Sequence, residues 1–434
     1  MTEMTIGIPR FRGRVRRPEV LVIGGGLSGM TAALAARRTG AEVTLVADGA
    51  GVLELASGCI DRLAVPFETL PPAHPYRLLG METVDQELGD FQEEMARVGW
   101  GLSPGDKEVI TALGARRPTY LVGPGMTAPP PGEPVWVVGF RGLRDFDPAV
   151  VAAGLGGAPW SWVDLPGQPE EVHPVALARL LQNEVYREEV IDAVLAARDA
   201  AGLSVAGEGS GRRWVLFPAV LGLTGAEKVQ ADFATAVGMR LAEVLLPPPS
   251  VPGLRLAEAL RRVVQQAGVD LALGARAVRA EVSNGRVHSV VCEGAGGQVT
   301  YEAGAYVLAT GGLLGNGLVA DGLLVREPLF DLPVATPGGS GHGTARQDPT
   351  GQDPSAWADA DFLPAGGHPF VRVGVTVDED LRPEGFSNLF VCGRTLAGYD
   401  PYAEGCGGGV AVATGGAAGR LAGCQAVSEG GERR

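Results

Sequence analysis

A glycine-rich turn at residues 20–30, VLVIGGGLSGM, restricts the possible folds of this chain more than any other stretch. The apolar run before the turn predicts a buried strand, and residues 30–38 (MTAALAARR) predict a helix after it. Gly24, Gly26 and Gly29 have the G-x-G-x-x-G spacing that permits a tight turn, close approach of the backbone to a phosphate, and close helix–strand packing. The stretch therefore predicts a dinucleotide-type fold with a phosphate at the helix N-terminus, and a merely structural turn is the alternative.

The next strand, expected at residues 43–46, completes a β-α-β unit. In dinucleotide binders an acidic residue at the end of this strand holds the ribose hydroxyls. Ala47 occupies the usual place here, with Asp48 beside it. Either Asp48 substitutes, or the adenosine half of the ligand is held weakly or is missing, so the choice between FAD and FMN stays open.

Three later stretches predict further contacts with a flavin. Ala56-Ser57-Gly58 forms a small-residue loop, Ala309-Thr310-Gly311 ends a buried strand, and glycines at residues 405–409 precede a C-terminal helix. For the last stretch, a glycine-rich packing contact is the alternative. The candidate cofactor-binding residues are Gly24, Gly25, Gly26, Leu27, Ser28, Gly29, Asp48, Ser57, Gly58, Thr310, Gly311, Gly393, Gly405, Cys406, Gly407, Gly408 and Gly409.

These signals predict an α/β, Rossmann-type FAD/NAD(P)-binding flavoprotein fold with an inserted α/β domain. A meander is expected from four alternating runs at residues 269–273, 277–282, 287–292 and 299–303, with Asn284-Gly285 as a hairpin turn. The flavin-binding domain is expected in three segments, which are residues 19–65, residues 250–316 with the meander, and residues 386–434. The other expected divisions are a basic arm (1–18), an inserted α/β cap domain (66–249) and a second insertion (317–385).

Composition narrows the classes of partner. The net charge of -14 argues against nucleic acid, although five arginines between residues 10 and 17 form a basic arm that could dock on an acidic surface or stay solvated. The five cysteines are scattered without a C-x-x-C pair, so the sequence predicts a reduced, cytoplasmic protein with no metal or iron–sulfur site. The sequence contains no run of about 20 apolar residues, so we expect no direct transmembrane segment.

Several specific stretches resemble one protein family nearly end to end. Besides GGGLSG at residues 24–29, they are ASGCID (56–61), AHPYRLLG (73–80), PPSVPGLRL (248–256), GLVADGLLVREP (317–328), GVTVDEDLRP (374–383) and AGYDPYAEGCGGGVAVA (397–413). With these stretches the chain resembles the B subunits of the anaerobic glycerol-3-phosphate dehydrogenases, which are related to the fumarate reductase flavoproteins.

The resemblance implies an assembly of three different subunits that oxidises sn-glycerol 3-phosphate to dihydroxyacetone phosphate. It implies FMN on this chain, with FAD as the alternative. It also implies two partners, of which one is an FAD-bearing A subunit. The other is an iron–sulfur C subunit, which anchors the cytoplasmic assembly to the inner membrane and passes electrons to quinone.

Oxidation of a secondary alcohol needs a base near the hydroxyl group and cations for the phosphate. His74 and His342 are the candidate bases, although a His before Pro is also a common structural hydrogen bonder. Arg255, Arg326 and Arg394 are candidate substrate clamps because guanidinium binds phosphate bidentately, and each could instead be a structural ion-pair partner.

Three functional hypotheses remain from the sequence. The first is a flavin-binding subunit of a glycerol-3-phosphate:quinone oxidoreductase. The second is a self-sufficient, fumarate reductase-like FAD oxidoreductase acting on a dicarboxylate or steroid-like small molecule. The third is a non-catalytic assembly subunit with a vestigial nucleotide site, which the alanine at position 47 motivates.

Overall fold

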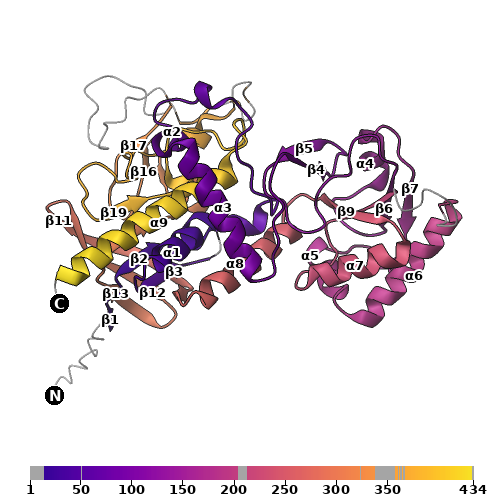
Figure 1. Ribbon diagram of the computed structural model, residues 1–434, viewed down its shortest axis with the longest axis horizontal. Helices are drawn as coiled ribbons and strands as arrows, with labels where there is room; N and C mark the ends of the chain where they lie inside the picture. Colours follow the sequence, from indigo (N-terminus) through magenta and orange to yellow (C-terminus); the bar gives the residue numbers. More distant parts are fainter. Residues whose placement is uncertain are drawn as a thin grey trace, which may run out of the picture.

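The chain folds into two lobes that lie side by side (Figure 1). The computed structural model describes residues 14–49, 51–203, 213–322, 324–337, 357–359, 361, 364 and 367–432. Strands from the beginning, middle and end of the sequence build one lobe, whereas a single continuous segment builds the other. We call them the nucleotide lobe and the cap lobe.

A five-stranded parallel sheet forms the centre of the nucleotide lobe. Its spatial order is β10 (Asp270–Leu273), β3 (Val43–Ala47), β2 (Val20–Ile23), β14 (Ala305–Leu308) and β19 (Leu389–Val391). All residues of β2, β3, β14 and β19 are buried, as expected for apolar strands covered on both faces. The Rossmann-type core predicted from the sequence is therefore confirmed.

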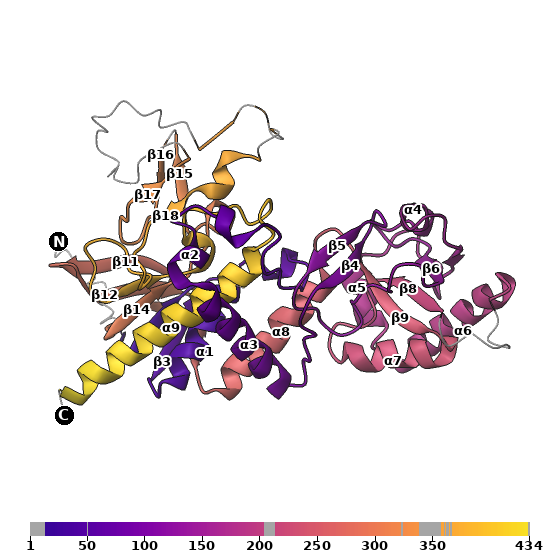
Figure 2. The same cartoon turned by 45° about the horizontal axis from the view of Figure 1, so that its top comes forward.

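Helices cover this sheet. They are α1 (Leu27–Arg38), α2 (Pro75–Leu79), α3 (Met81–Arg97), α8 (Val251–Gln266) and α9 (Gly407–Glu432). The helix after the glycine turn begins at Leu27, three residues earlier than expected, because Gly26 already serves as its N-cap. In Figures 1 and 2, α9 runs the length of the lobe beside α1.

Glycines let α9 approach α1 at backbone distance. A Cβ atom at Gly415, Gly419 or Gly423 would overlap or closely approach the backbone oxygens of Ser28, Ala32 and Ala36, respectively. These glycines recur every four residues and therefore lie on one face of α9. Any larger residue on this face would push the two helices apart.

A second sheet of the nucleotide lobe consists of β1 (Arg14–Arg16), β13 (Gly297–Tyr301), β12 (Arg286–Gly294) and β11 (Ala275–Ser283). The hairpin turn at Asn284-Gly285 is confirmed, since both residues have positive φ. The expectation that residues 269–273 belong to this meander is wrong, because β10 pairs in parallel with β3. The end of the basic arm is also ordered here, where β1 pairs in parallel with β13 and Arg16 lies 2.8 Å from Asp270.

The cap lobe contains a six-stranded sheet. Its order is β5 (Arg116–Thr119), β4 (Lys107–Thr111), β9 (Arg240–Leu245), β8 (Trp214–Pro218), β6 (Val135–Phe140) and β7 (Trp160–Val163), and only β5 is antiparallel to its neighbour. Its helices are α4 (Pro148–Gly154), α5 (Pro174–Leu180), α6 (Glu184–Ala200) and α7 (Ala226–Val237). The insertion is narrower than the expected 66–249, because α2 and α3 pack on the nucleotide lobe.

The expected second insertion contains short elements. They are the hairpin of β15 (Val319–Asp321) and β16 (Leu324–Arg326), and the pair of β17 (Val334–Ala335) with β18 (Gly374–Val375). One-turn 3-10 helices lie at Leu53–Leu55, Phe67–Thr69, Leu313–Gly315, Pro369–Arg372 and Gly393–Thr395. Among the described residues, none of the helices combines the length and apolar character needed to cross a bilayer.

Candidate functional site

The glycine turn packs as its spacing predicts. Gly24 has φ of 120°, and a Cβ atom there would overlap the carbonyl oxygen of Ala309. A Cβ atom at Gly29 would overlap the carbonyl oxygen of Gly24. Gly26 differs, since apart from Gly26 itself and its two chain neighbours no atom of the described residues lies within 4 Å of the position of its Cβ. The packing roles of Gly24 and Gly29 are thereby confirmed, and the open face at Gly26 leaves room for a ligand at the N-terminus of α1.

A buried hydroxyl group lies at the neighbouring strand end. Thr310 follows β14, and its Oγ1 makes no hydrogen bond within the described part of the chain. The next residue, Gly311, donates its N–H to Thr395 Oγ1 at 3.0 Å. Because buried hydroxyl groups are normally hydrogen-bonded, Thr310 is suited to a polar ligand that enters beside Gly26. These features fit the phosphate and ribityl portion of a flavin.

Gly393 joins this region to the end of the chain. Its φ is 68°, and a Cβ atom there would overlap Ser28 Oγ in the first turn of α1. Its N–H donates to Thr414 Oγ1 in α9 at 2.9 Å. The ends of β14 and β19 and the first turn of α1 therefore meet at one edge of the sheet, where nucleotides bind in folds of this kind.

Asp48 has a partner of its own. It follows the last residue of β3, and its carboxylate lies 2.6 Å from the guanidinium of Arg276 on β11. Both side chains are more than half exposed, so the ion pair is weak and a ribose could displace it. The contact of Asp48 with a ribose remains a prediction. Arg276 competes with the ribose for the Asp48 carboxylate, and the sequence does not reveal this pairing.

Ser57 and Gly58 lie where the two lobes meet. A Cβ atom at Gly58 would lie 2.6 Å from the carbonyl oxygen of Pro252, at the start of α8. Ser57 Oγ accepts a hydrogen bond from Arg117 of the cap lobe at 3.3 Å. These contacts give the loop a structural role between lobes, and its contact with a flavin remains a prediction.

The C-terminal glycine cluster is tightly packed. Gly405, Gly407 and Gly408 have Ala64, Pro401 and Ile60 against their Cβ positions. A Cβ atom at Gly409 would overlap the hydroxyl of Tyr76, and its N–H donates to the carbonyl oxygen of Asp61 at 2.8 Å. The glycine-rich packing contact, the alternative to a flavin contact, therefore accounts for most of these positions.

The three candidate substrate arginines are engaged within the protein. Arg255 is buried and forms a bidentate ion pair with Glu243, and its Nε donates to the carbonyl oxygen of Gly222. Its prediction as a phosphate clamp is wrong for this reason. Arg394 donates to backbone carbonyl oxygens of residues 370–373, whereas Arg326 is exposed and lies 3.6 Å from Asp321. His342 lies outside the described residues.

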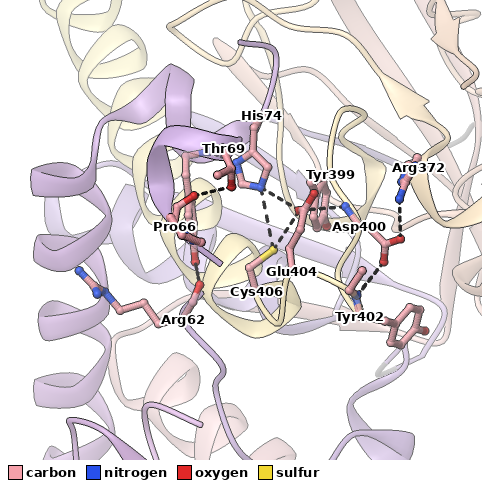
Figure 3. Close-up of polar contacts among 12 residues, drawn as sticks. Arg62, Pro66, Thr69, His74, Arg372, Tyr399, Asp400, Tyr402, Glu404 and Cys406 are labelled. Atoms are coloured by element: carbon pink, nitrogen blue, oxygen red, sulfur yellow. Dashed lines mark hydrogen bonds and ion pairs between the residues drawn. The ribbon is translucent and has the colours of Figure 1, made fainter. Parts of the chain in front are cut away.

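His74 belongs to a buried polar cluster with Glu404 and Cys406 (Figure 3). Its Nε2 lies 3.1 Å from Glu404 Oε2 and 4.0 Å from Cys406 Sγ. Its Nδ1 accepts the backbone N–H of Tyr76 at 2.9 Å and thereby caps the N-terminus of α2. The ring connects an early loop with the segment before α9, 330 residues later in the chain.

The comparisons with known proteins agree with this architecture. A model of the FAD binding domain family matches residues 19–410. The B subunit of a probable anaerobic glycerol-3-phosphate dehydrogenase from Halobacterium salinarum is 35% identical over 93% of this chain and 97% of its own length. The chain belongs to the family of anaerobic glycerol-3-phosphate dehydrogenase B subunits.

Other relatives extend the comparison. The corresponding B subunit of the anaerobic glycerol-3-phosphate dehydrogenase of Vibrio cholerae is 31% identical over 91% of this chain and 94% of that protein. Among solved structures, an open conformation of a flavocytochrome c3 fumarate reductase is 12% identical, with a TM-score of 0.42, covering 95% of this chain and 79% of that chain.

Arg372, which lies near the His74 cluster, escapes sequence reasoning as a site candidate. Asp400 is buried, and its carboxylate accepts the N–H groups of Tyr402 and Ala403 at 3.1 and 3.0 Å. Arg372, which is half exposed, lies 3.4 Å from Asp400 (Figure 3). The pair places a cation near the His74 cluster, and no spacing in the sequence connects residues so far apart.

A separate cleft of about 480 Å³ lies at the C-terminal ends of α1, α3 and α8. Its cations are already paired: Arg38 and Arg97 both contact Glu94, and Arg37 donates to backbone carbonyl oxygens. The cleft lies at the opposite end of α1 from Gly26, so we assign it no part in the site.

The cysteines of this chain should differ sharply in reactivity. Burial raises the pKa of Cys59, Cys292 and Cys392 to about 12 and also raises the pKa of Cys406, whereas Cys424 is exposed. Since the thiolate is the nucleophile, we expect one fast-reacting thiol per folded chain with Ellman's reagent at pH 8, and five after denaturation. Cys424→Ser should remove the fast phase, and two or more fast thiols would contradict the packing described here.

Proposed function

We propose that this chain is the flavin-bearing subunit of an anaerobic glycerol-3-phosphate:quinone oxidoreductase. Relatives named as B subunits match it over more than nine-tenths of its length. The observation that carries the proposal is the open face at Gly26 beside the buried hydroxyl of Thr310, which no described residue hydrogen-bonds, at the sheet edge where such folds hold a nucleotide. Conversion of sn-glycerol 3-phosphate to dihydroxyacetone phosphate is the proposed reaction.

FMN is the proposed cofactor, and FAD is the alternative. Gly24 to Gly29 would surround the phosphate, with Thr310, Gly311 and Gly393 at the ribityl side. Ala47, at the usual place of the acid that holds the ribose, favours a flavin that needs no ribose contact at the end of β3. The FAD binding domain family match supports the alternative. When bound, a flavin supplies the two-electron oxidising capacity that amino-acid side chains lack.

The proposed partners are an FAD-bearing A subunit of the same enzyme and its iron–sulfur C subunit. The naming of the relatives as B subunits supports an assembly of several different chains. In this proposal the iron–sulfur partner carries electrons to quinone and attaches the complex to the inner membrane.

The test is to purify the chain under anaerobic conditions, release its cofactor with acid and identify it by mass. We expect about one FMN per chain. About one FAD per chain would keep the proposed role as a flavoprotein, and the contact with the adenosine half would then be assigned to Asp48. A colourless chain that takes up neither FMN nor FAD would contradict the proposal.

A second candidate function is an assembly subunit that holds a flavin without turnover of substrate. Engagement of Arg255 and Arg394 with protein groups favours it, because neither presents a free guanidinium for a phosphate. The two candidates differ in one measurement: mixing glycerol 3-phosphate with the flavin-loaded chain bleaches the flavin only if oxidation takes place on this chain.

A further inference from the structure

The hydrogen bonds of His74 fix which of its ring nitrogens carries a proton. Nδ1 accepts the backbone N–H of Tyr76, so Nδ1 must offer its lone pair. The neutral ring then carries its hydrogen on Nε2, which points at Glu404 Oε2. In this tautomer neither nitrogen has a free lone pair for a substrate proton or a metal ion. His74 is therefore a donor to Glu404, and its prediction as the catalytic base does not fit this geometry.

Glu404 receives its contacts on one oxygen. Oε2 accepts from His74 Nε2 at 3.1 Å, from the backbone N–H of Asp400 at 3.0 Å, and from the Cys406 thiol at 3.7 Å. Burial raises the pKa of Cys406, which keeps its hydrogen on sulfur and preserves it as a donor. Within the described part of the chain Oε1 makes no hydrogen bond, and it is not among the buried unpartnered atoms. This oxygen is held in place and can be reached by solvent.

The cluster is joined by direct contacts to the glycine turn. The Tyr399 ring lies edge-on to His74, with ring centroids 5.9 Å apart, and its hydroxyl donates to the carbonyl oxygen of Gly393 at 3.4 Å. Gly393 in turn packs on Ser28 in the first turn of α1. Figure 3 shows Tyr399, His74 and Glu404 around one point at the start of α9. Glu404 is thereby connected to the region proposed for the flavin through His74, Tyr399 and Gly393.

We propose that Glu404 is the base that takes the hydroxyl proton of the substrate, and that His74 is the positioning residue that holds its carboxylate. The assignment rests on the proposed function. Oε1 takes the proton as the O–H bond of the secondary alcohol breaks, and that electron pair forms the C=O bond. A bound flavin would supply the acceptor for the hydrogen that leaves the carbinol carbon with its two electrons, so atoms and electrons would balance.

Several charged or titratable groups surround Glu404, so the base must be assigned by substitution. The groups are His74 at the start of α2, Cys406 and Asp400 on the same loop as Glu404, Tyr399 beside His74, and Arg372 beyond Asp400. Glu404→Gln keeps an acceptor for His74 and removes the group that can take a proton. His74→Asn keeps an N-cap acceptor for the Tyr76 N–H but removes the donor to Glu404.

The experiment mixes the purified, flavin-loaded chain with glycerol 3-phosphate and follows flavin bleaching from pH 5 to 9. For Glu404→Gln we expect a rate per bound flavin about 100-fold or more below wild type. Flavin content, melting temperature and the dissociation constant for dihydroxyacetone phosphate should stay within twofold or a few degrees of wild type. Glu384→Gln, at an exposed position with the same change of charge, should behave as wild type.

His74→Asn tests the positioning role. We expect the bleaching rate per bound flavin to fall about 10-fold or more, with the dissociation constant for dihydroxyacetone phosphate within twofold of wild type, because the carboxylate loses the donor that holds it in place. A merely structural role for His74 would change the melting temperature without lowering that rate. Glu404→Asp, which keeps a carboxylate at a shorter reach, should retain part of the rate.

The outcomes separate the assignment from the function on which it rests. A wild-type chain whose loaded flavin is not bleached by glycerol 3-phosphate would overturn the proposed function and the Glu404 assignment together. A wild-type chain that is bleached, with Glu404→Gln within threefold of it, would overturn Glu404 alone. One tightly bound zinc per chain, lost in Glu404→Gln, would also overturn it, since the cluster would then be a metal site.

Discussion

Gly26→Asp is expected to give a folded chain that no longer retains a flavin. Gly26 has φ of -77° and ψ of -175°, a conformation open to any residue, and beyond its two chain neighbours no other described residue comes within 4 Å of its Cβ position. It is also the N-cap of α1, where Asp is among the preferred residues. The fold should therefore tolerate the change, whereas the carboxylate would occupy the region proposed for the phosphate and repel it.

We expect the melting temperature of apo Gly26→Asp to stay within a few degrees of apo wild type, and its flavin affinity to fall by about 100-fold or more, or about 2.7 kcal/mol. Gly26→Ala, which adds only a methyl group, should lose less affinity. Gly29→Ala is the contrasting control, because its Cβ would overlap the Gly24 carbonyl oxygen and should destabilise the fold by about 1–3 kcal/mol. Flavin titration followed by absorbance, together with thermal unfolding, measures all three variants.

An undiminished flavin affinity in Gly26→Asp would show that the phosphate lies elsewhere. A large loss of stability in the same variant would instead show that this face is packed in solution. The pair of measurements thus tests the ligand site and the packing separately.

Arg255→Ala should be among the most destabilising single substitutions where the nucleotide lobe meets the cap lobe. Arg255 on α8 and Glu243 on β9 are both almost fully buried, and the carboxylate also accepts from Gln230 and from the N–H of Leu221. Removal of the arginine leaves an uncompensated buried charge, which costs about 3–5 kcal/mol. The double variant Arg255→Met with Glu243→Gln removes both charges and should recover some of that loss.

Urea unfolding followed by tryptophan fluorescence provides the measurement, since Trp136, Trp160, Trp162 and Trp214 all lie on strands of the cap sheet. We expect the urea concentration at the midpoint of cap-lobe unfolding to fall in Arg255→Ala and to rise again in the double variant. Unchanged stability with a weakened affinity for glycerol 3-phosphate would restore Arg255 as a substrate clamp.

The Rossmann core could be predicted because its signals are local. The strand, the glycine spacing and the following helix are contiguous in sequence, and Gly24 and Gly29 pack as expected. The pairing of strands that lie far apart in the sequence has no such local signal. The run at residues 269–273 alternates like a meander strand, yet its neighbour is β3, more than 220 residues earlier. Alternation reports which face is buried, not which strand pairs with it.

The site is only partly predictable, because the contacts that decide its chemistry join residues far apart in the sequence. Arg255 has the residue type of a phosphate clamp, but its function depends on Glu243, which lies on another element. The sequence indicates that His74 is chemically important, but its tautomer depends on the Tyr76 N–H and its partner is Glu404. Residue type indicates what a side chain can do, and only the fold shows which of its atoms are already bonded.

The strand order of the nucleotide lobe also governs when the site can form during synthesis. The cap sheet comes from one continuous segment, so it can fold as soon as that segment is available. The sheet that carries the glycine turn needs β19, and Gly393 needs Thr414 of α9; both elements follow the whole cap segment in the sequence. A nascent chain would therefore present a finished cap beside an open nucleotide lobe until β19 and α9 have been synthesised. Capture of the cofactor must accordingly wait for these two elements, which makes flavin binding a later step than folding of the cap.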